Sequence, residues 1–134
     1  MLSVGNDYPR LAELAIIASM LQIREAQMAA FREARRKDFL RRLENYVRQQ
    51  VVSGLLPIHP ERVPEQVQAG IEAARLLRLI NECDILSYIV IVCRYLGGFP
   101  VDHPRPALHL LLRPGVPSAA RLRQFEEWVV QQRS

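Results

Sequence analysis

The placement of proline and glycine constrains this chain more than any other feature of its sequence. No proline occurs between Ile23 and Val51, so this stretch predicts one helix of six or more turns. Ser53-Gly54 and three closely spaced prolines then predict a loop of about a dozen residues. Gly97-Gly98 and the Pro-Gly-Val-Pro of residues 114–117 are the next breaks. The chain is therefore divided into helical segments joined by short irregular connections.

Apolar residues recur at helical spacing in each of these segments. In the long segment, one stripe runs through Ile23 and Phe31 and continues through Phe39, Leu43 and Val47. Asn81, with Asp84 three residues later, predicts the cap of a further helix, and Ser118 predicts the cap of the last one. We expect helices over residues 9–20, 23–51, 63–80, 82–96 and 107–113, and from residue 118 onward. The pattern leaves open whether the first two are one continuous helix.

The most apolar segment runs from Ile85 to Cys93 and is hydrophobic nearly all round, as expected of a helix at the centre of a bundle. No segment alternates in the way a strand requires. These patterns predict an all-α fold, namely a compact bundle of four or five main helices with one long basic helix and a proline-rich loop before the C-terminal helix. We expect a single domain, residues 1–134, in which residues 1–22 form an N-terminal helical extension.

Cellular location is predicted from two features. Met1 is followed by Leu-Ser-Val-Gly-Asn-Asp and not by the basic start and apolar run of a signal peptide. The apolar segment from Ile85 to Cys93 is much shorter than the roughly 20 residues that a membrane span needs. We therefore expect a soluble, cytoplasmic protein with no membrane contact.

Histidine and cysteine are the residues to inspect for catalysis or metal binding. His59, His103 and His109 have no histidine or cysteine partner at the spacing of a zinc site. Cys83 and Cys93 lie in an apolar stretch, where a free cysteine usually behaves as a small hydrophobe. We expect loop or surface histidines, no metal and no catalytic residue.

Carboxylates and phosphate loops offer no alternative chemistry. Most acidic residues lie at helix starts or beside basic residues, which predicts caps and solvated faces. Gly97-Gly98 follows a helix, whereas phosphate-binding glycines precede one. We expect no cofactor and no enzymatic activity.

Basic residues are concentrated in the long segment, where Arg35, Arg36 and Lys37 are followed by Arg41 and Arg42. The formal net charge is +4, and only Lys37 is a lysine among the 18 basic residues. Acidic residues interleave at helical spacing, and no helix-turn-helix signature accompanies the run. Nucleic-acid binding is therefore a weak alternative to a solvated bundle face or a contact with an acidic protein.

The first helical segment is more apolar than one core-facing stripe requires. Its apolar residues cover over half of its circumference, which predicts that something else covers part of this surface: a second copy of the chain, a partner protein, or two other helices of the same chain. With the start of the basic helix, the predicted partner-binding residues are Leu11, Leu14, Ile16, Ile17, Met20, Leu21, Arg35 and Arg36.

From Ile23 onward the chain resembles a family of short helical accessory proteins encoded beside type VI secretion effectors in Gram-negative bacteria. The resemblance covers about 100 residues, and residues 1–22 precede it. It is carried by residues 23–31 with Phe39, residues 70–75, Asp84-Ile85, Tyr88-Ile89, the Leu-Gly-Gly-Phe of residues 96–99 and the Asp-His-Pro of residues 102–104.

The resemblance implies a non-enzymatic co-chaperone or adaptor that helps to load a type VI secretion effector by binding the effector or its chaperone. A cytoplasmic immunity protein that neutralises a toxin by direct binding is the alternative, for which the Arg-rich helix would need an acidic target. A nucleic-acid-binding regulator is the weaker alternative. The partner is expected to be a protein, with a homodimer also possible.

Overall fold

The computed structural model describes residues 10–133, which contain α-helices, one short 3-10 helix and connecting loops, and no strand within that range. The chain divides after Asp38 into two compact units, of which residues 10–38 and residues 39–133 are described. The all-α prediction, with one long helix and a proline-containing loop before the last helix, is confirmed. The single domain expected for residues 1–134 stays a prediction.

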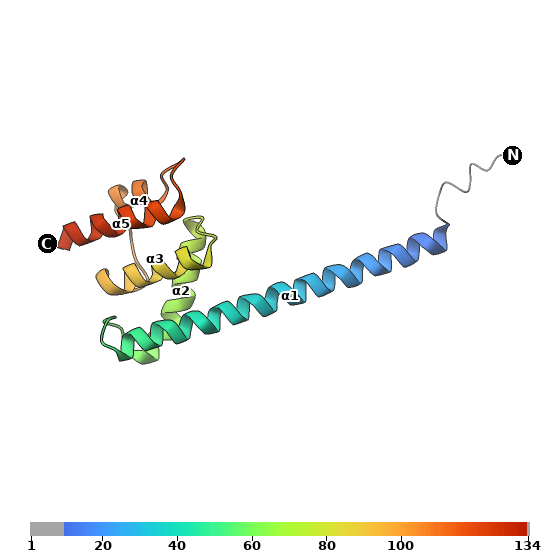
Figure 1. Cartoon of the computed structure of the whole chain (residues 1–134), viewed down its shortest axis with the longest axis horizontal. Helices are drawn as coiled ribbons and strands as arrows, with labels where there is room; N and C mark the ends of the chain where they lie inside the picture. Colours follow the sequence, from blue (N-terminus) through green and yellow to red (C-terminus); the bar gives the residue numbers. More distant parts are fainter. Residues whose placement is uncertain (1–9, 134) are drawn as a thin grey trace. The chain divides into compact units, whose positions relative to one another are not determined.

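The long helix α1 spans Leu11–Val52 (Figure 1). The two segments that the sequence left separate are one helix, because the residues between them are good helix formers and no proline or glycine interrupts the backbone. The start predicted at Pro9 lies outside the described residues. Helix α1 ends where Ser53 and Gly54 turn the chain, and Gly54 adopts the positive φ that glycine tolerates.

The other elements all belong to residues 39–133 and begin close to their predicted positions. A 3-10 helix, η2, occupies Pro60–Arg62 and leads into α2, Val63–Leu76. Helix α3, Glu82–Tyr95, follows the predicted cap, since the Asn81 side chain accepts a hydrogen bond from the Cys83 backbone N–H at 2.8 Å. Helix α4 spans Arg105–Leu111 and α5 spans Ser118–Arg133.

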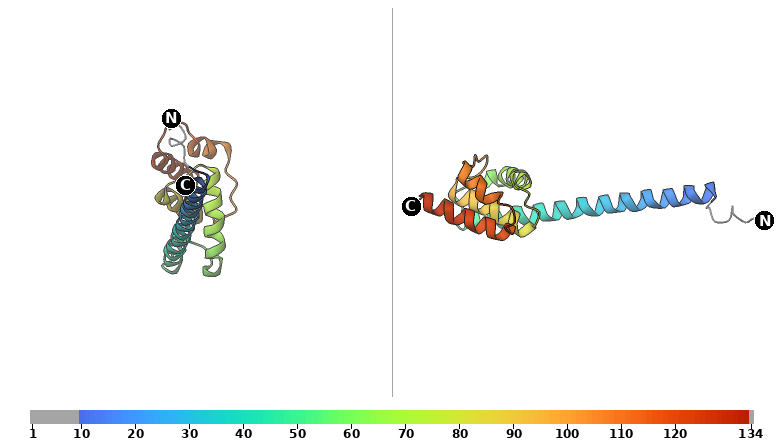
Figure 2. Two further views of the ribbon diagram at one scale, coloured as in Figure 1. Left: turned by 90° about the vertical axis from the view of Figure 1, so that its right-hand side faces the viewer. Right: turned by 90° about the horizontal axis from the view of Figure 1, so that it is seen from above.

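Helix α3 is the central helix of this unit, as predicted. It packs against α2 and α5, and α4 packs against α5; both figures show α4 and α5 side by side (Figures 1 and 2). Tyr88, Ile89 and Val92 of α3 are fully buried. The end of α1 contributes Leu43 and Val47 to the same core. The remaining core residues are Leu56, Val63, Val67, Ala74, Leu77, Leu79, Ile91, Cys93, Phe99, Ala107, Leu111, Leu122, Phe125 and Val129.

A buried glutamine fixes the loop that follows α3. The Gln66 side chain donates to the Phe99 carbonyl at 2.7 Å and accepts from the Phe99 N–H at 2.5 Å. A Cβ on Gly98 would collide with the Gln66 Oε1, so only glycine permits this approach. Gly70, one turn further along α2, similarly lets Ile89 and Phe99 approach the helix backbone. The loop after α3 is therefore held to α2 by paired polar groups as well as by apolar contact.

Four local predictions are wrong. Helix α2 ends at Leu76 and not near Ile80, because Arg78 takes a left-handed conformation (φ 60°) that stops the helix. The helical spacing of Leu96 after Tyr88, Ile89 and Val92 predicts that it also lines the core, but it is 39% exposed. Asp84 does not serve as a capping-box acid, because it is buried and accepts a hydrogen bond from the Ser118 hydroxyl. Ser118 is thus the first residue of α5, and its hydroxyl points to α3.

Candidate partner-binding surface

The six apolar residues predicted to bind a partner are all exposed in α1. Leu11 is 85% exposed, Met20 64% and Ile16 60%. Leu14, Ile17 and Leu21 are about half exposed. These six residues are called the N-terminal apolar surface below. These large apolar side chains form a contiguous exposed surface. Monomeric proteins usually bury such side chains or expose them only singly.

This surface continues further along the helix than the sequence analysis assigned. Ile23, Met28 and Phe31 are also about half exposed. The continuous stripe predicted from Ile23 to Val47 therefore divides in two, because Leu43 and Val47 are buried in the core whereas Ile23 and Phe31 are not. No local signal separates the two halves of the stripe, because both carry large apolar residues at helical spacing.

The exposed apolar residues occupy two sides of the helix. At 3.6 residues per turn, Ile16, Met20 and Ile23 project from one side. Leu14, Ile17 and Leu21 project from another, which Met28 and Phe31 extend. A helix with two apolar sides can contact two neighbouring elements at once.

The predicted basic residues directly follow the apolar run. The Arg35 guanidinium lies over the Phe31 ring, with 5.9 Å between its central carbon and the ring centroid. Arg36 forms a salt bridge with Glu33 at 2.8 Å, in which both side chains remain exposed. Between residues 32 and 37, four basic side chains accompany this single acid. The positive charge of this segment is therefore only partly neutralised and faces solvent.

The histidines lie in loops or at the surface, as predicted, but they differ in how far they are buried. His103 lies in a loop but is half buried, with its Nε2 2.6 Å from the Tyr88 hydroxyl and its ring edge-on to Phe125. Burial lowers the pKa of His103 and outweighs the opposite effect of Asp102. Burial also raises the pKa of Tyr88. The hydrogen bond between the His103 Nε2 and the Tyr88 hydroxyl ties the loop to α3.

Cys83 is exposed at the start of α3, and Cys93 is buried in the core. Burial raises the pKa of the Cys93 thiol to about 12, so it is protonated and inert as a nucleophile at neutral pH. Within residues 10–133, no group of three or more His, Cys, Asp or Glu side chains could hold a metal ion. Over the same part of the chain, no helix is both long and apolar enough to cross a membrane.

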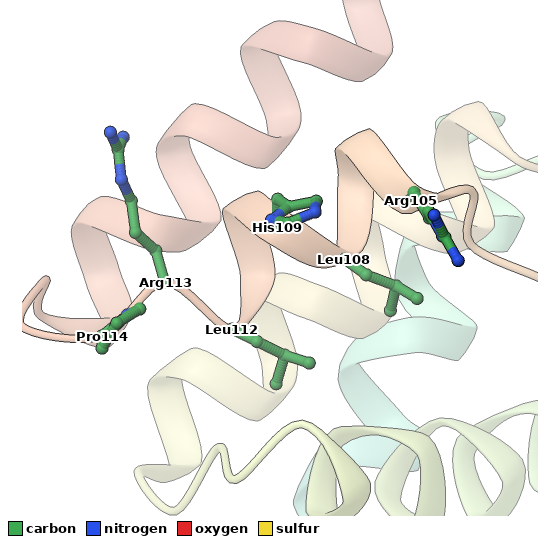
Figure 3. Close-up of a pocket in the computed structure, with 6 residues that line it drawn as sticks. All are labelled: Arg105, Leu108, His109, Leu112, Arg113 and Pro114. Carbon is green, nitrogen blue, oxygen red and sulfur yellow. The ribbon is translucent and has the colours of Figure 1, made fainter.

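A shallow pocket of about 320 Å³ lies along α4 and the turn after it (Figure 3). Arg105, His109 and Arg113 line it together with Leu108 and Leu112. The two arginine side chains point in opposite directions in the close-up, so they do not converge on one anion (Figure 3). This pocket therefore lacks the convergent polar groups that a small-molecule site requires.

Comparison with known proteins gives no match to a family model, to a curated protein or to a solved structure.

Proposed function

We propose that this protein is a non-enzymatic adaptor or co-chaperone that helps to load a type VI secretion effector by binding the effector or its chaperone. The observation that carries the proposal is the N-terminal apolar surface, whose six large side chains are between 46% and 85% exposed. Burying such side chains against a partner is favourable by about 25 cal/mol per Å² of apolar surface. Exposed apolar residues on a helix are typical of helix-in-groove recognition between proteins.

The charge of the neighbouring segment favours one class of partner. The arginine-rich residues 32–37 directly follow the apolar residues and leave uncompensated positive charge. A partner segment that fits both features is an amphipathic helix whose apolar side is followed by acidic residues. Arg35 and Arg36 would then contact carboxylates at the edge of the interface, where arginine can bind them in pairs.

A matched pair of variants tests the surface. Nine residues equal two and a half helical turns, so Ala29 lies on the side of α1 opposite Met20. The full-length protein is used to capture the proposed effector–chaperone pair. We expect Met20→Glu to abolish capture and Ala29→Glu to retain it, since a charge on the apolar surface must be desolvated on binding. Full capture by Met20→Glu would overturn the assignment of this surface.

A second experiment separates the co-chaperone from the alternatives. The protein is co-expressed with the toxic domain of the neighbouring effector in the cytoplasm, and effector delivery to competitor cells is measured in a strain that lacks it. We expect loss of delivery without the protein and no protection from the cytoplasmic toxin. Protection would instead assign an immunity protein, and salt-dependent binding to DNA or RNA would assign a nucleic-acid regulator.

A further inference from the structure

The second apolar side of α1 follows a heptad. Leu14, Ile17, Leu21, Arg24, Met28 and Phe31 are separated by three, four, three, four and three residues. This 3.5-residue period keeps a seam facing one partner helix along its length, whereas the side chains of a straight helix drift by about 20° per heptad. The five apolar residues of this seam are each 46–58% exposed. We call these six residues the heptad seam.

Two copies of the heptad seam have complementary side chains when they are aligned antiparallel. When two copies are aligned antiparallel about the midpoint between Leu21 and Arg24, Leu14 lies opposite Phe31, Ile17 opposite Met28, and Leu21 opposite Arg24. Every layer then contains at least one large apolar side chain, and both outer layers are wholly apolar. The overlap is 18 residues, or about 27 Å of helix at 1.5 Å per residue.

A parallel alignment is disfavoured by charge. It places Arg24 opposite its own copy in the middle of the seam. Like charges at facing core positions repel and cannot be solvated together. The antiparallel alignment gives Arg24 an aliphatic neighbour instead. A single polar residue within such a seam sets register and orientation at some cost in stability.

The other apolar side of the helix lacks this symmetry. Ile16, Met20 and Ile23 are large, but the positions that continue their spacing are Gln27, Ala30 and Ala34. In an antiparallel pair the large residues would face small or polar ones, which leaves poorly filled layers. That side therefore suits a different protein, and the heptad seam suits a second copy of this chain.

We propose that residues 14–31 form an antiparallel two-helix coiled coil with the same residues of a second copy. In the dimer, Leu14, Ile17 and Leu21 of the N-terminal apolar surface contact the second copy. Ile16 and Met20 of that surface, together with Ile23, remain for the effector or its chaperone. This inference concerns self-association, goes beyond the proposed function and does not depend on it.

The first test measures the mass of the purified full-length protein as a function of concentration by analytical ultracentrifugation. We expect a concentration-dependent dimer. Ile17→Glu should weaken it by more than about a hundredfold, because each dimer would bury two carboxylates. Ala26→Glu, on the opposite side of the helix, should not change it. Arg24→Leu should strengthen it by more than about tenfold, because it completes the central layers. A monomer at all concentrations for both the unsubstituted protein and Arg24→Leu would overturn the proposal.

The second test determines orientation by disulfide formation in a Cys83→Ser background. An antiparallel dimer places residue 14 near residue 31 of the other copy. We expect a cross-link when a Leu14→Cys chain is mixed with a Phe31→Cys chain, and none when either chain is oxidised alone. Cross-linking of each chain alone would show parallel pairing and overturn the antiparallel assignment.

A final comparison keeps this inference separate from the proposed function. We expect Met20→Glu to remain dimeric while losing the effector–chaperone pair. A monomeric protein that still captures the pair would overturn the dimer alone, and a dimer that never captures it would overturn the proposed function alone.

Discussion

The two units of this chain use the same kinds of residue in opposite ways. Ile89 in residues 39–133 is fully buried, whereas Ile16 in residues 10–38 is 60% exposed, although both lie in apolar stretches of helices. In the larger unit, buried polar groups such as Gln66 and Asp84 also have hydrogen-bond partners. The difference teaches that apolar residues at helical spacing predict that a helix face is buried against something. They do not predict whether that neighbour belongs to the same chain or to another molecule. In residues 39–133 other helices supply that contact, and for residues 10–38 we propose that other molecules do.

The largest expected effect is a charge placed in the core. Ile89→Asp buries a carboxylate without a partner between α2 and α3, which should cost more than about 4 kcal/mol and prevent folding. Ile16→Asp makes the same change on the exposed helix and should alter stability by less than about 0.5 kcal/mol. Urea denaturation followed by circular dichroism measures both. If both variants lost the same free energy of unfolding, the two units would not differ in the way described.

The fold of residues 39–133 was largely predictable because its signals are local. Pro64 with an acidic first turn marks the start of α2, Asn81 marks that of α3, and the all-round apolarity of residues 85–93 identifies the central helix. The end of α2 was not predictable from composition. Arg78 and Leu79 donate to the carbonyls of Arg75 and Ala74 in a helix-ending turn that glycine usually makes, and an arginine at this position gives no signal in the sequence.

The polar contacts that join loops and helices of residues 39–133 were also missed, because their partners are 15 to 34 residues apart in sequence. Gly98 and Phe99 meet Gln66, Tyr88 meets His103, and Asp84 meets Ser118. These residues build the fold of residues 39–133, whereas the candidate partner-binding residues lie in residues 10–38.

The second largest effect is expected at the buried glutamine of α2. Gln66→Leu would leave the Phe99 N–H and carbonyl buried without partners, which should cost about 3 kcal/mol. Gln68→Leu is the matched control, because Gln68 lies on the same helix and is exposed. Denaturant unfolding measures both. If the two substitutions are equally mild, the polar pairing does not hold the loop.

A smaller effect is expected from pH. Burial holds the pKa of folded His103 below its ordinary 6.5, so the unfolded chain takes up a proton more readily than the folded one. This contribution to stability is complete above about pH 6.5 and is lost as the pH falls through 6.5 towards the lower pKa of the folded state. The thermal midpoint of the protein should therefore fall between about pH 7.5 and about pH 5.

His103→Gln, which can still donate to or accept from Tyr88 but cannot titrate, should flatten that dependence. His109→Gln, at an exposed position, should leave it unchanged. An identical pH profile for His103→Gln and the unsubstituted protein would contradict the assignment to His103.

The smallest effect on stability is expected from a substitution of Arg36, which should nevertheless weaken partner binding. Arg36→Ala breaks an exposed salt bridge with Glu33 and should change the free energy of unfolding by less than about 0.5 kcal/mol. It should nevertheless weaken capture of an acidic partner several-fold, because a positive charge at the edge of an interface attracts the carboxylates of the partner. Arg113→Ala removes an exposed arginine outside the proposed surface and should affect neither property. Unchanged partner capture by Arg36→Ala would remove this arginine from the proposed interface.

The two cysteines differ in accessibility, so the rate of thiol modification can report on opening of the core. Cys83 is exposed and should react with a thiol reagent at once. Cys93 is fully buried and protonated, so its reaction must wait until the surrounding helices separate. With Cys83 replaced by serine, the rate of Cys93 modification would report how often α3 becomes accessible. The labelling rate of this one sulfur atom in the native state would thus measure how fast the bundle opens, with no reporter group introduced into the protein beforehand.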